Sequence, residues 1–275
     1  MLAGSDRCWL EVIAMSFTKP FHRNYRGIKP GIQSGYSGWA YIRDREYAKN
    51  AEHYVRAFLM IQSELQSIFE YLEPSDECRL AYSYRIHGLL MRTCIEVEAN
   101  FKAILEENFF TPPQRRSLNM TDYRKTDATH HLSSYEVMLP IWNGTPPIFK
   151  PFEPWRAGRG LSVPGLSLPW YQAYNASKHD RHDEFKKANF ENVVMAVAGL
   201  LVLISSQFRD QDFSAGSEGL ALSGYDYHPL EPSIGSLFRI KYPDDWTDDE
   251  LYDFDWTVLK AENSRFGKIN FDLIP

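Results

Sequence analysis

Apolar residues recur at three- and four-residue spacing in the first half of the chain, which is the pattern of helices with one buried face. The first such stretch covers residues 45–72 and the second covers residues 77–108. Between them, Pro74 is a stop signal and Ser75 and Asp76 are good N-caps. Because this connection is short, we expect the two helices to lie antiparallel, as a helical hairpin.

Two further helices are expected over residues 168–183 and 186–208. Pro169 suits the first turn of the third helix. The fourth range is the most apolar segment of the chain, and Gly199 within it predicts that another helix approaches closely. Its expected buried residues are Phe190, Val193, Val194, Val197, Leu200, Leu201, Ile204 and Phe208.

Residues 109–167 interrupt the helical pattern with many prolines and glycines. A short helix is expected around residues 121–133 and a short strand around 135–141. A loop of this length is often functional, so we interpret the range as an insertion that forms a lid or a partner-binding surface. Two neighbouring histidines, His130 and His131, are expected at the surface.

Both ends of the chain differ from the helical middle. Residues 1–44 are expected to form an irregular arm, either a partly ordered leader or a basic, aromatic segment that contacts a partner or nucleic acid. Residues 209–275 are expected to form a linker and a small β-rich segment, with strands near 237–243, 252–260 and 266–272. The acidic run over 244–250 is expected to be solvated.

Composition narrows the class of protein. A chain of 275 residues fits one main domain with appendages, and its net charge of −6 provides no global basic field to attract nucleic acid. Three cysteines without a C-x-x-C spacing fit reduced thiols. The start resembles no signal peptide, and the longest apolar run, Val193 to Ile204, is about 12 residues, whereas a membrane span needs roughly 20. We therefore expect a cytoplasmic protein without a membrane partner.

The candidate chemistry lies directly before the fourth helix, in the segment WYQAYNASKHDRHDEF. Asn175 and His179 are four residues apart and point the same way on a helix, while Lys178, Arg181 and His182 cover an adjacent face. A histidine can transfer protons near neutral pH, and a neighbouring cation can hold a phosphate. This combination suits RNA cleavage by attack of a 2′-hydroxyl, with His179 and Asn175 as catalytic residues and Lys178 and Arg181 as substrate-binding residues.

Other interpretations of the same residues remain open. His179 can instead cap or hydrogen-bond within the bundle, and His179, His182 and Asp183 form a weak metal pattern that lacks a further ligand at motif spacing. The sequence contains no phosphate-binding loop, dinucleotide fingerprint or zinc cysteine pair, so neither cofactor nor metal is predicted. Arg92 and Glu96 share one helix face, as either an exposed ion pair or a polar row facing a substrate cleft.

The order of four helices, with N-x-x-K-H-x-R before the last, resembles the HEPN superfamily over residues 45–208. The string YNASKHDR is similar to an element of uncharacterised bacterial HEPN-like proteins. The resemblance implies a mainly α, four-helix HEPN-like bundle that forms a homodimer and acts as a metal-independent endoribonuclease or RNA-directed component of a defence or toxin–antitoxin system. The alternative is a non-catalytic dimerisation and protein-interaction module. In the family's catalytic pattern an arginine precedes the histidine by four to six residues; here Asn175 stands near that place and His179 matches the histidine.

Overall fold

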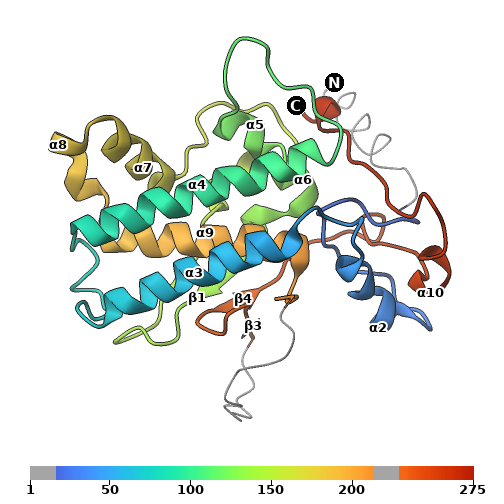
Figure 1. The fold of residues 1–275 in the computed structure, drawn as a ribbon, viewed down its shortest axis with the longest axis horizontal. Coiled ribbons are helices and arrows are strands. Elements are labelled where there is room, and N and C mark those ends of the chain that lie inside the picture. The colour runs from blue at the N-terminus through green and yellow to red at the C-terminus, as the bar shows by residue number, and fades with distance from the viewer. Residues whose placement is uncertain (1–16, 214–228) are drawn as a thin grey trace, which may run out of the picture.

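The chain folds around four long helices. The computed structural model describes residues 17–213 and 229–275, and Figure 1 shows their arrangement. Helix α4 packs along α9, α3 packs against both, and α7 covers a further side of α4 and α9. The described part of the chain is mainly helical, and the prediction of four helices packed in one bundle is confirmed. The four helices are α3 (Ala51–Phe69), α4 (Tyr84–Glu106), α7 (Pro169–His179) and α9 (Phe190–Phe208).

All four helices are shorter than their predicted ranges, and two of them begin late because a polar side chain caps them within the range. The hydroxyl of Ser83 accepts a hydrogen bond from the backbone N–H of Ile86, which fixes the start of α4. The side chain of Asn189 accepts one from the N–H of Asn192 and fixes the start of α9. Such caps satisfy N–H groups that have no partner within the helix.

The loop before α4, predicted as helix, instead binds the start of α9. The carbonyl of Ala81 accepts a hydrogen bond of 2.8 Å from the N–H of Phe190, and the carbonyl of Arg79 accepts one of 2.9 Å from Glu191. The guanidinium of Arg79 also pairs with the Glu191 carboxylate at 2.8 Å. This loop therefore occupies the N-terminal end of α9, and its backbone is not available for helix.

Helix α9 lies at the centre of the bundle. It is apolar on all sides, and its residues from Ala196 to Phe208 are all buried. A side chain at Gly199 would meet the ring of Trp170, only 3.1 Å from an ideal Cβ position, which confirms the close helix approach that the glycine predicted. By length and composition α9 could cross a membrane, yet 83% of its most apolar window is buried inside the protein. Its apolarity is accounted for by this central position.

A small antiparallel sheet joins two distant parts of the chain. Strands β1 (Glu136–Met138) and β2 (Ile148–Phe149) come from the insertion, and β3 (Glu231–Pro232) and β4 (Arg239–Lys241) come from the C-terminal segment. Their order is β2-β1-β4-β3. Val137 of β1 lies opposite Phe149 on one side and Ile240 on the other. The sheet therefore makes the insertion and the C-terminal segment one structural layer beside the bundle (Figure 1).

Part of the insertion belongs to the core of the protein. Phe152 and Trp155 are fully buried and contact Phe101 of α4, with ring centroids 6.1 and 5.9 Å apart. The short helix expected near residues 121–133 is two short helices, α5 (Met120–Arg124) and α6 (Asp127–His130).

The remaining short elements are α2 (Ser34–Ser37), η1 (Ala40–Arg43), η2 (Leu132–Ser134), η3 (Glu153–Gly158), α8 (Arg181–Glu184), η4 (Phe185–Lys187), α10 (Trp256–Leu259) and η5 (Phe271–Leu273).

Two of the predicted C-terminal strands are wrong. Residues 252–260 contain α10 and residues 266–272 lead into η5. They pair with other segments only through single bridges, such as Tyr252 with Ile28 and Asn270 with Phe109. Their alternating aromatic residues are buried one at a time against the N-terminal arm, so the strand-like alternation arose without a sheet. The strand predicted near residues 237–243 is present as β4. Most of the expected linker, residues 214–228, lies outside the described residues.

The described part of the N-terminal arm enters the protein interior. Arg23 is fully buried, and its guanidinium donates to the Glu107 carboxylate at 2.7 Å and to the Gln207 side-chain oxygen at 2.8 Å. It also lies 4.6 Å from the ring centre of Tyr54. A buried charge needs such partners. The arm is therefore anchored in the protein at Arg23, while residues 1–16 lie outside the described range.

Truncation of the central helix should destabilise the protein strongly. Leu200 is 1% exposed, and replacing a buried leucine by alanine costs about 2–5 kcal/mol. His179→Ala, at the exposed end of α7, should change the free energy of unfolding by less than about 0.5 kcal/mol. Urea unfolding of both variants measures the difference. Equal destabilisation by the two substitutions would contradict an exposed, functional position for His179.

Candidate functional site

The predicted site segment forms one end of the bundle. Asp180 leaves the helical conformation, with φ −133° and ψ 75°, and its side chain accepts a hydrogen bond from the N–H of Asp183. Helix α7 therefore stops at His179 instead of continuing to residue 183, and α8 begins in a new direction. The chain then returns through η4, which contacts α7. Figure 1 shows α8 at the end of the bundle opposite α2 and α10.

Most of the predicted site residues are free at this end. His179, Arg181 and His182 are exposed and Asn175 is half-buried. Within residues 17–213 and 229–275, their side chains make no hydrogen bond or ion pair. The interpretation of His179 as a cap or internal hydrogen-bonding group is therefore wrong. Their hydrogen-bonding groups are available to a ligand, because no other side chain or backbone group in the described ranges binds them.

Lys178 faces away from this group. Its ammonium donates a hydrogen bond of 3.0 Å to the Tyr174 hydroxyl and lies 5.0 Å from the centre of that ring. This hydrogen bond raises the pKa of Lys178. On the same side, the Tyr171 hydroxyl donates to the Glu98 carboxylate of α4 at 2.8 Å. Lys178 thus has a partner within α7, unlike His179 and Arg181 in the described part of the chain, and its substrate-binding role stays a prediction.

Arg92 and Glu96 do not join the site. Arg92 forms an ion pair of 2.9 Å with Glu64 of α3, whereas α4 presents Glu98 to α7. Arg92 is thus paired with α3 instead of with Glu96, and no ion pair joins Arg92 to Glu96 within the described ranges. The substrate-binding role of both residues stays a prediction.

A groove of about 660 Å³ runs between α7, η4 and the loop before α4. Gln172 lines it, and because His179 lies seven residues later, both side chains project from the same side of α7. His179 itself does not line the groove; it lies further along α7 on the side that bears Gln172. Sequence reasoning missed the other polar lining of the groove, although the Lys-Lys pair after the motif was a usable signal. That lining comprises Lys186, Lys187, Asn189 and Asn192.

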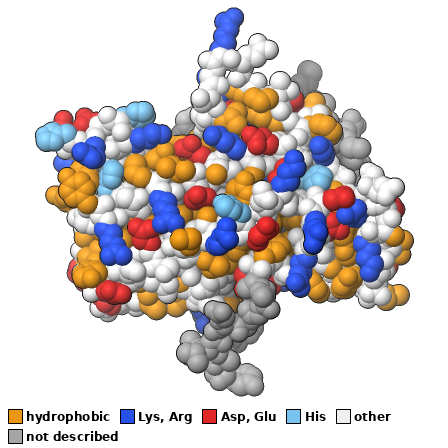
Figure 2. Space-filling model, viewed as in Figure 1, with side chains coloured by type: hydrophobic (Ala, Val, Ile, Leu, Met, Phe, Trp, Pro, Cys, Tyr) orange, Lys and Arg blue, Asp and Glu red, His pale blue; other side chains and the backbone are white. Residues whose placement is uncertain are grey.

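Aromatic rings gather beside the groove. Phe185 of η4 contacts the rings of Tyr82, Tyr84 and His87, with centroids 5.9, 4.9 and 5.2 Å apart. Tyr82 and Tyr84 are nevertheless 55% and 75% exposed. Figure 2 shows hydrophobic side chains beside histidine and lysine or arginine side chains at this end of the molecule. The site thus combines exposed rings with cations and amides.

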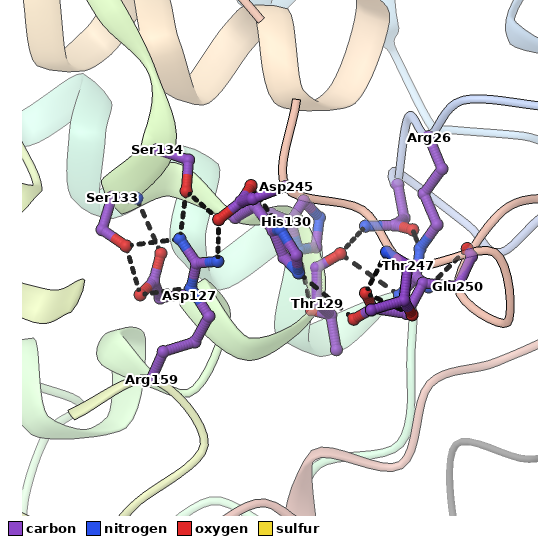
Figure 3. Close-up of polar contacts among 12 residues, drawn as sticks. Arg26, Asp127, Thr129, His130, Ser133, Ser134, Arg159, Asp245, Thr247 and Glu250 are labelled. Atoms are coloured by element: carbon purple, nitrogen blue, oxygen red, sulfur yellow. Dashed lines mark hydrogen bonds and ion pairs between the residues drawn. The ribbon is translucent and has the colours of Figure 1, made fainter. Parts of the chain in front are cut away.

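A second group of polar residues, in Figure 3, binds the insertion to the C-terminal segment. The two ring nitrogens of His131 lie 3.0 Å from Asp245 and 3.3 Å from Glu250, and its ring stacks on Trp246 with centroids 3.7 Å apart. Arg159 pairs with Asp245 at 2.7 Å. The solvated acidic run expected over residues 244–250 is thus partly wrong, because the carboxylates of Asp245 and Glu250 are half-buried and bind His131, and Asp245 also binds Arg159.

His130 and His131, expected at the surface, are buried. Nε2 of His130 lies 2.9 Å from the carbonyl of Arg23, and Nδ1 lies 2.9 Å from the Thr129 hydroxyl. Burial lowers the pKa of His130 to about 4, against a smaller opposite effect of its hydrogen bonds to backbone carbonyls. Asp127 is likewise buried and accepts hydrogen bonds from Ser133. Since these buried groups form hydrogen bonds with one another and with the backbone, we assign this cluster a structural role.

Within the described ranges, no three or more His, Cys, Asp or Glu side chains are arranged to hold a metal ion. His179, His182 and Asp183 are therefore not brought together as ligands.

The structural cluster predicts a loss of stability in acid. Burial of Glu250 opposes its ionisation, but hydrogen bonds from His131 and Thr247 outweigh it and lower the pKa of Glu250 from 4.5 to about 2. A lowered carboxyl pKa stabilises the fold above about pH 4.5, and this contribution is lost as the pH falls towards 2. His130, with a pKa lowered from 6.5 to about 4, adds a loss between those values. Glu250→Gln should destabilise the protein at pH 7 by about 1–3 kcal/mol and have no effect near pH 2.

Urea unfolding at a series of pH values measures this dependence. Asp249→Asn is the matched control, because Asp249 lies in the same acidic run but is exposed. An acid dependence that Glu250→Gln leaves unchanged would contradict the assignment.

No protein-family model, curated protein or solved structure matches this chain.

Proposed function

We propose that this protein acts on RNA at the α7–α8 end of the bundle and cleaves it without a metal ion, with His179 as the group that accepts a proton. The observation that carries the proposal is the set of free side chains there. Asn175, His179, Arg181 and His182 have no partner within the described ranges, whereas the polar groups of the buried cluster bond one another. Exposed, unpaired histidine and arginine side chains can transfer protons and bind the charge of a phosphodiester.

The proposed reaction is an internal transesterification. His179 accepts the proton of a ribose 2′-hydroxyl, and the 2′ oxygen attacks the adjacent phosphorus. The bond from phosphorus to the 5′ oxygen breaks, which leaves a 2′,3′-cyclic phosphate. The 5′ oxygen leaves with a proton from protonated His182, so one proton is taken and one is given. Arg181 stabilises the charge on the phosphoryl oxygens, and Asn175, one helical turn before His179, orients the substrate.

The resemblance to the HEPN superfamily supports the same proposal at the level of the fold. The third helix of the bundle carries the histidine motif at its end, and the fourth helix follows as the central apolar element. We propose on this basis a HEPN-like RNA-directed protein of a bacterial defence or toxin–antitoxin system, active in the cytoplasm. Asn175 stands near the place of the family's arginine and carries no charge. We therefore assign the neutralisation of the phosphate to Arg181 in this chain.

Cleavage should depend on His179 and survive chelation. Purified protein incubated with total RNA in excess EDTA should yield fragments with cyclic or 3′-phosphate ends, and His179→Ala should reduce the rate by about 100-fold or more, the usual contribution of a general base. Gel analysis with end-group labelling measures both. His53→Ala, which removes an exposed histidine of α3, is the control and should retain full activity. Activity lost in EDTA, or kept in His179→Ala, would exclude this mechanism.

Self-association is a second expectation of the family resemblance. We propose a homodimer with the α7 ends near a two-fold axis, the commonest symmetry of oligomers. Light scattering at micromolar concentration should give twice the chain mass of 31.9 kDa. A monomer mass at that concentration would contradict this arrangement but not the chemistry of His179.

A non-catalytic interaction module is the second candidate function. The observation in its favour is the group of exposed apolar side chains near the start of α4, where Tyr71 is 79% and Leu80 is 72% exposed. Such a group is also found where a protein partner binds. This candidate would be preferred if the purified protein leaves RNA intact.

A further inference from the structure

Tyr82 separates two hollows at the site end of the bundle. On one side lies the groove with Lys186 and Lys187. On the other side a hollow of about 370 Å³ is lined by Tyr71, Tyr82 and Arg85. An exposed ring with a hollow and a cation on each side matches a single nucleic-acid strand. The ring can bind a flat base, and the two cations can bind the phosphates on either side of it.

The rings are held in place rather than scattered over the surface. Phe185 lies between the rings of Tyr82, Tyr84 and His87, and its contact with Tyr82 is edge-on, at an interplanar angle of 89°. Because Phe185 belongs to η4, these contacts also hold η4, which carries Lys186, beside the two tyrosines. The exposed parts of the two tyrosines therefore form a platform of defined position, to which a base can bind without ordering the side chains first.

Unpaired polar groups accompany the platform. Lys186 and Arg85 are exposed and have no ion-pair partner within the described ranges, whereas Lys187 is paired with Glu184. The Gln172 amide in the groove is exposed and makes no side-chain hydrogen bond there. Two free cations can neutralise phosphates on either side of Tyr82, and a free amide can donate to and accept from the edge of a base.

We propose that Tyr82 and Tyr84 stack unpaired bases of a single-stranded RNA, with its phosphates at Lys186 and Arg85, so that the substrate class of this site is single-stranded rather than duplex RNA. Base faces are accessible to aromatic side chains only where the bases are unpaired. This inference rests on the proposed function, which identifies the ligand as RNA. It adds that the RNA is bound as a single strand.

The same layout connects the platform to the reacting end. Gln172 and His179 are seven residues apart on one side of α7, which is roughly 10 Å along the helix axis. About three stacked nucleotides span that length. A strand that rests on Tyr82 and follows the groove past Gln172 therefore brings a later phosphodiester to His179.

The experiment measures binding separately from cleavage. Fluorescein-labelled 12-nucleotide oligouridylate and oligoadenylate, and the duplex made from them, are titrated in EDTA with the full chain carrying His179→Ala, and anisotropy is recorded. The single strands should bind at least 10-fold more tightly than the duplex. Their affinity should fall as salt rises, because the contacts to phosphate release counterions.

Variants test the roles of the rings and of the cation. Tyr82→Ala should weaken binding of the single strand by about 10-fold, while Tyr82→Phe should stay within about 2-fold, because stacking needs the ring and not the hydroxyl. Lys186→Gln should weaken binding and reduce the salt dependence. Tyr36→Ala and Lys102→Gln, exposed residues on α2 and α4, are matched controls that should bind normally. Melting temperatures confirm that each variant is folded.

The outcomes are distinguishable from those of the proposed function. Tighter binding of the duplex, or unchanged binding in Tyr82→Ala and Lys186→Gln, overturns the inference even if the native chain cleaves RNA. Selective binding of single strands by these residues supports it even if His179 proves not to be catalytic. The absence of any RNA binding at low salt overturns it and leaves the exposed rings as a surface for a protein partner.

Discussion

The burial of α9 on all sides is the constraint on which the rest of the structure depends. A helix that is apolar around its whole circumference cannot face water, so α3, α4 and α7 must all pack against it. Its ends then position distant segments. The backbone N–H groups of Phe190 and Glu191 bind the loop before α4, and Gln207 near its other end binds the buried Arg23 of the N-terminal arm. Because this loop carries Tyr82 and binds the start of α9, directly after η4, Tyr82 lies beside η4.

The two polar regions of the molecule differ in how their hydrogen-bonding capacity is used. In the cluster of His131, Arg159, Asp245 and Glu250, the polar groups are partners of one another and lie partly out of solvent, and Arg159 is paired with Asp245. At the end of α7, by contrast, His179 and Arg181 are exposed and unpaired within the described ranges. Charges that are already paired add rigidity, since breaking a buried pair is costly. Charges that are free can be offered to a ligand, and this difference separates the candidate site from the structural cluster.

The insertion and the C-terminal segment show why local patterns misled the sequence analysis. Residues 252–260 and 266–272 alternate polar and aromatic positions, but the aromatic side chains are buried against the arm and the bundle instead of within a sheet. His130 and His131 stand in a stretch rich in polar residues, yet hydrogen bonds from partners more than 100 positions away in the chain hold them inside, as with Arg23 for His130 and Asp245 for His131. Such long-range partners leave no mark in the local sequence.

The sequence by itself determined the four helices and the identity of the central one, because helical periodicity and all-round apolarity are local properties. It also determined that Asn175, His179, Arg181 and His182 lie close together, since they are within a few residues of one another. Only the tertiary structure decided which of the neighbouring cations face the site. Arg92 is paired with Glu64 of α3, and Lys186 returns to the groove through the break at Asp180. The direction of a side chain depends on where its helix stops and on which helix packs against it, and both are set by contacts between segments that are far apart in the chain.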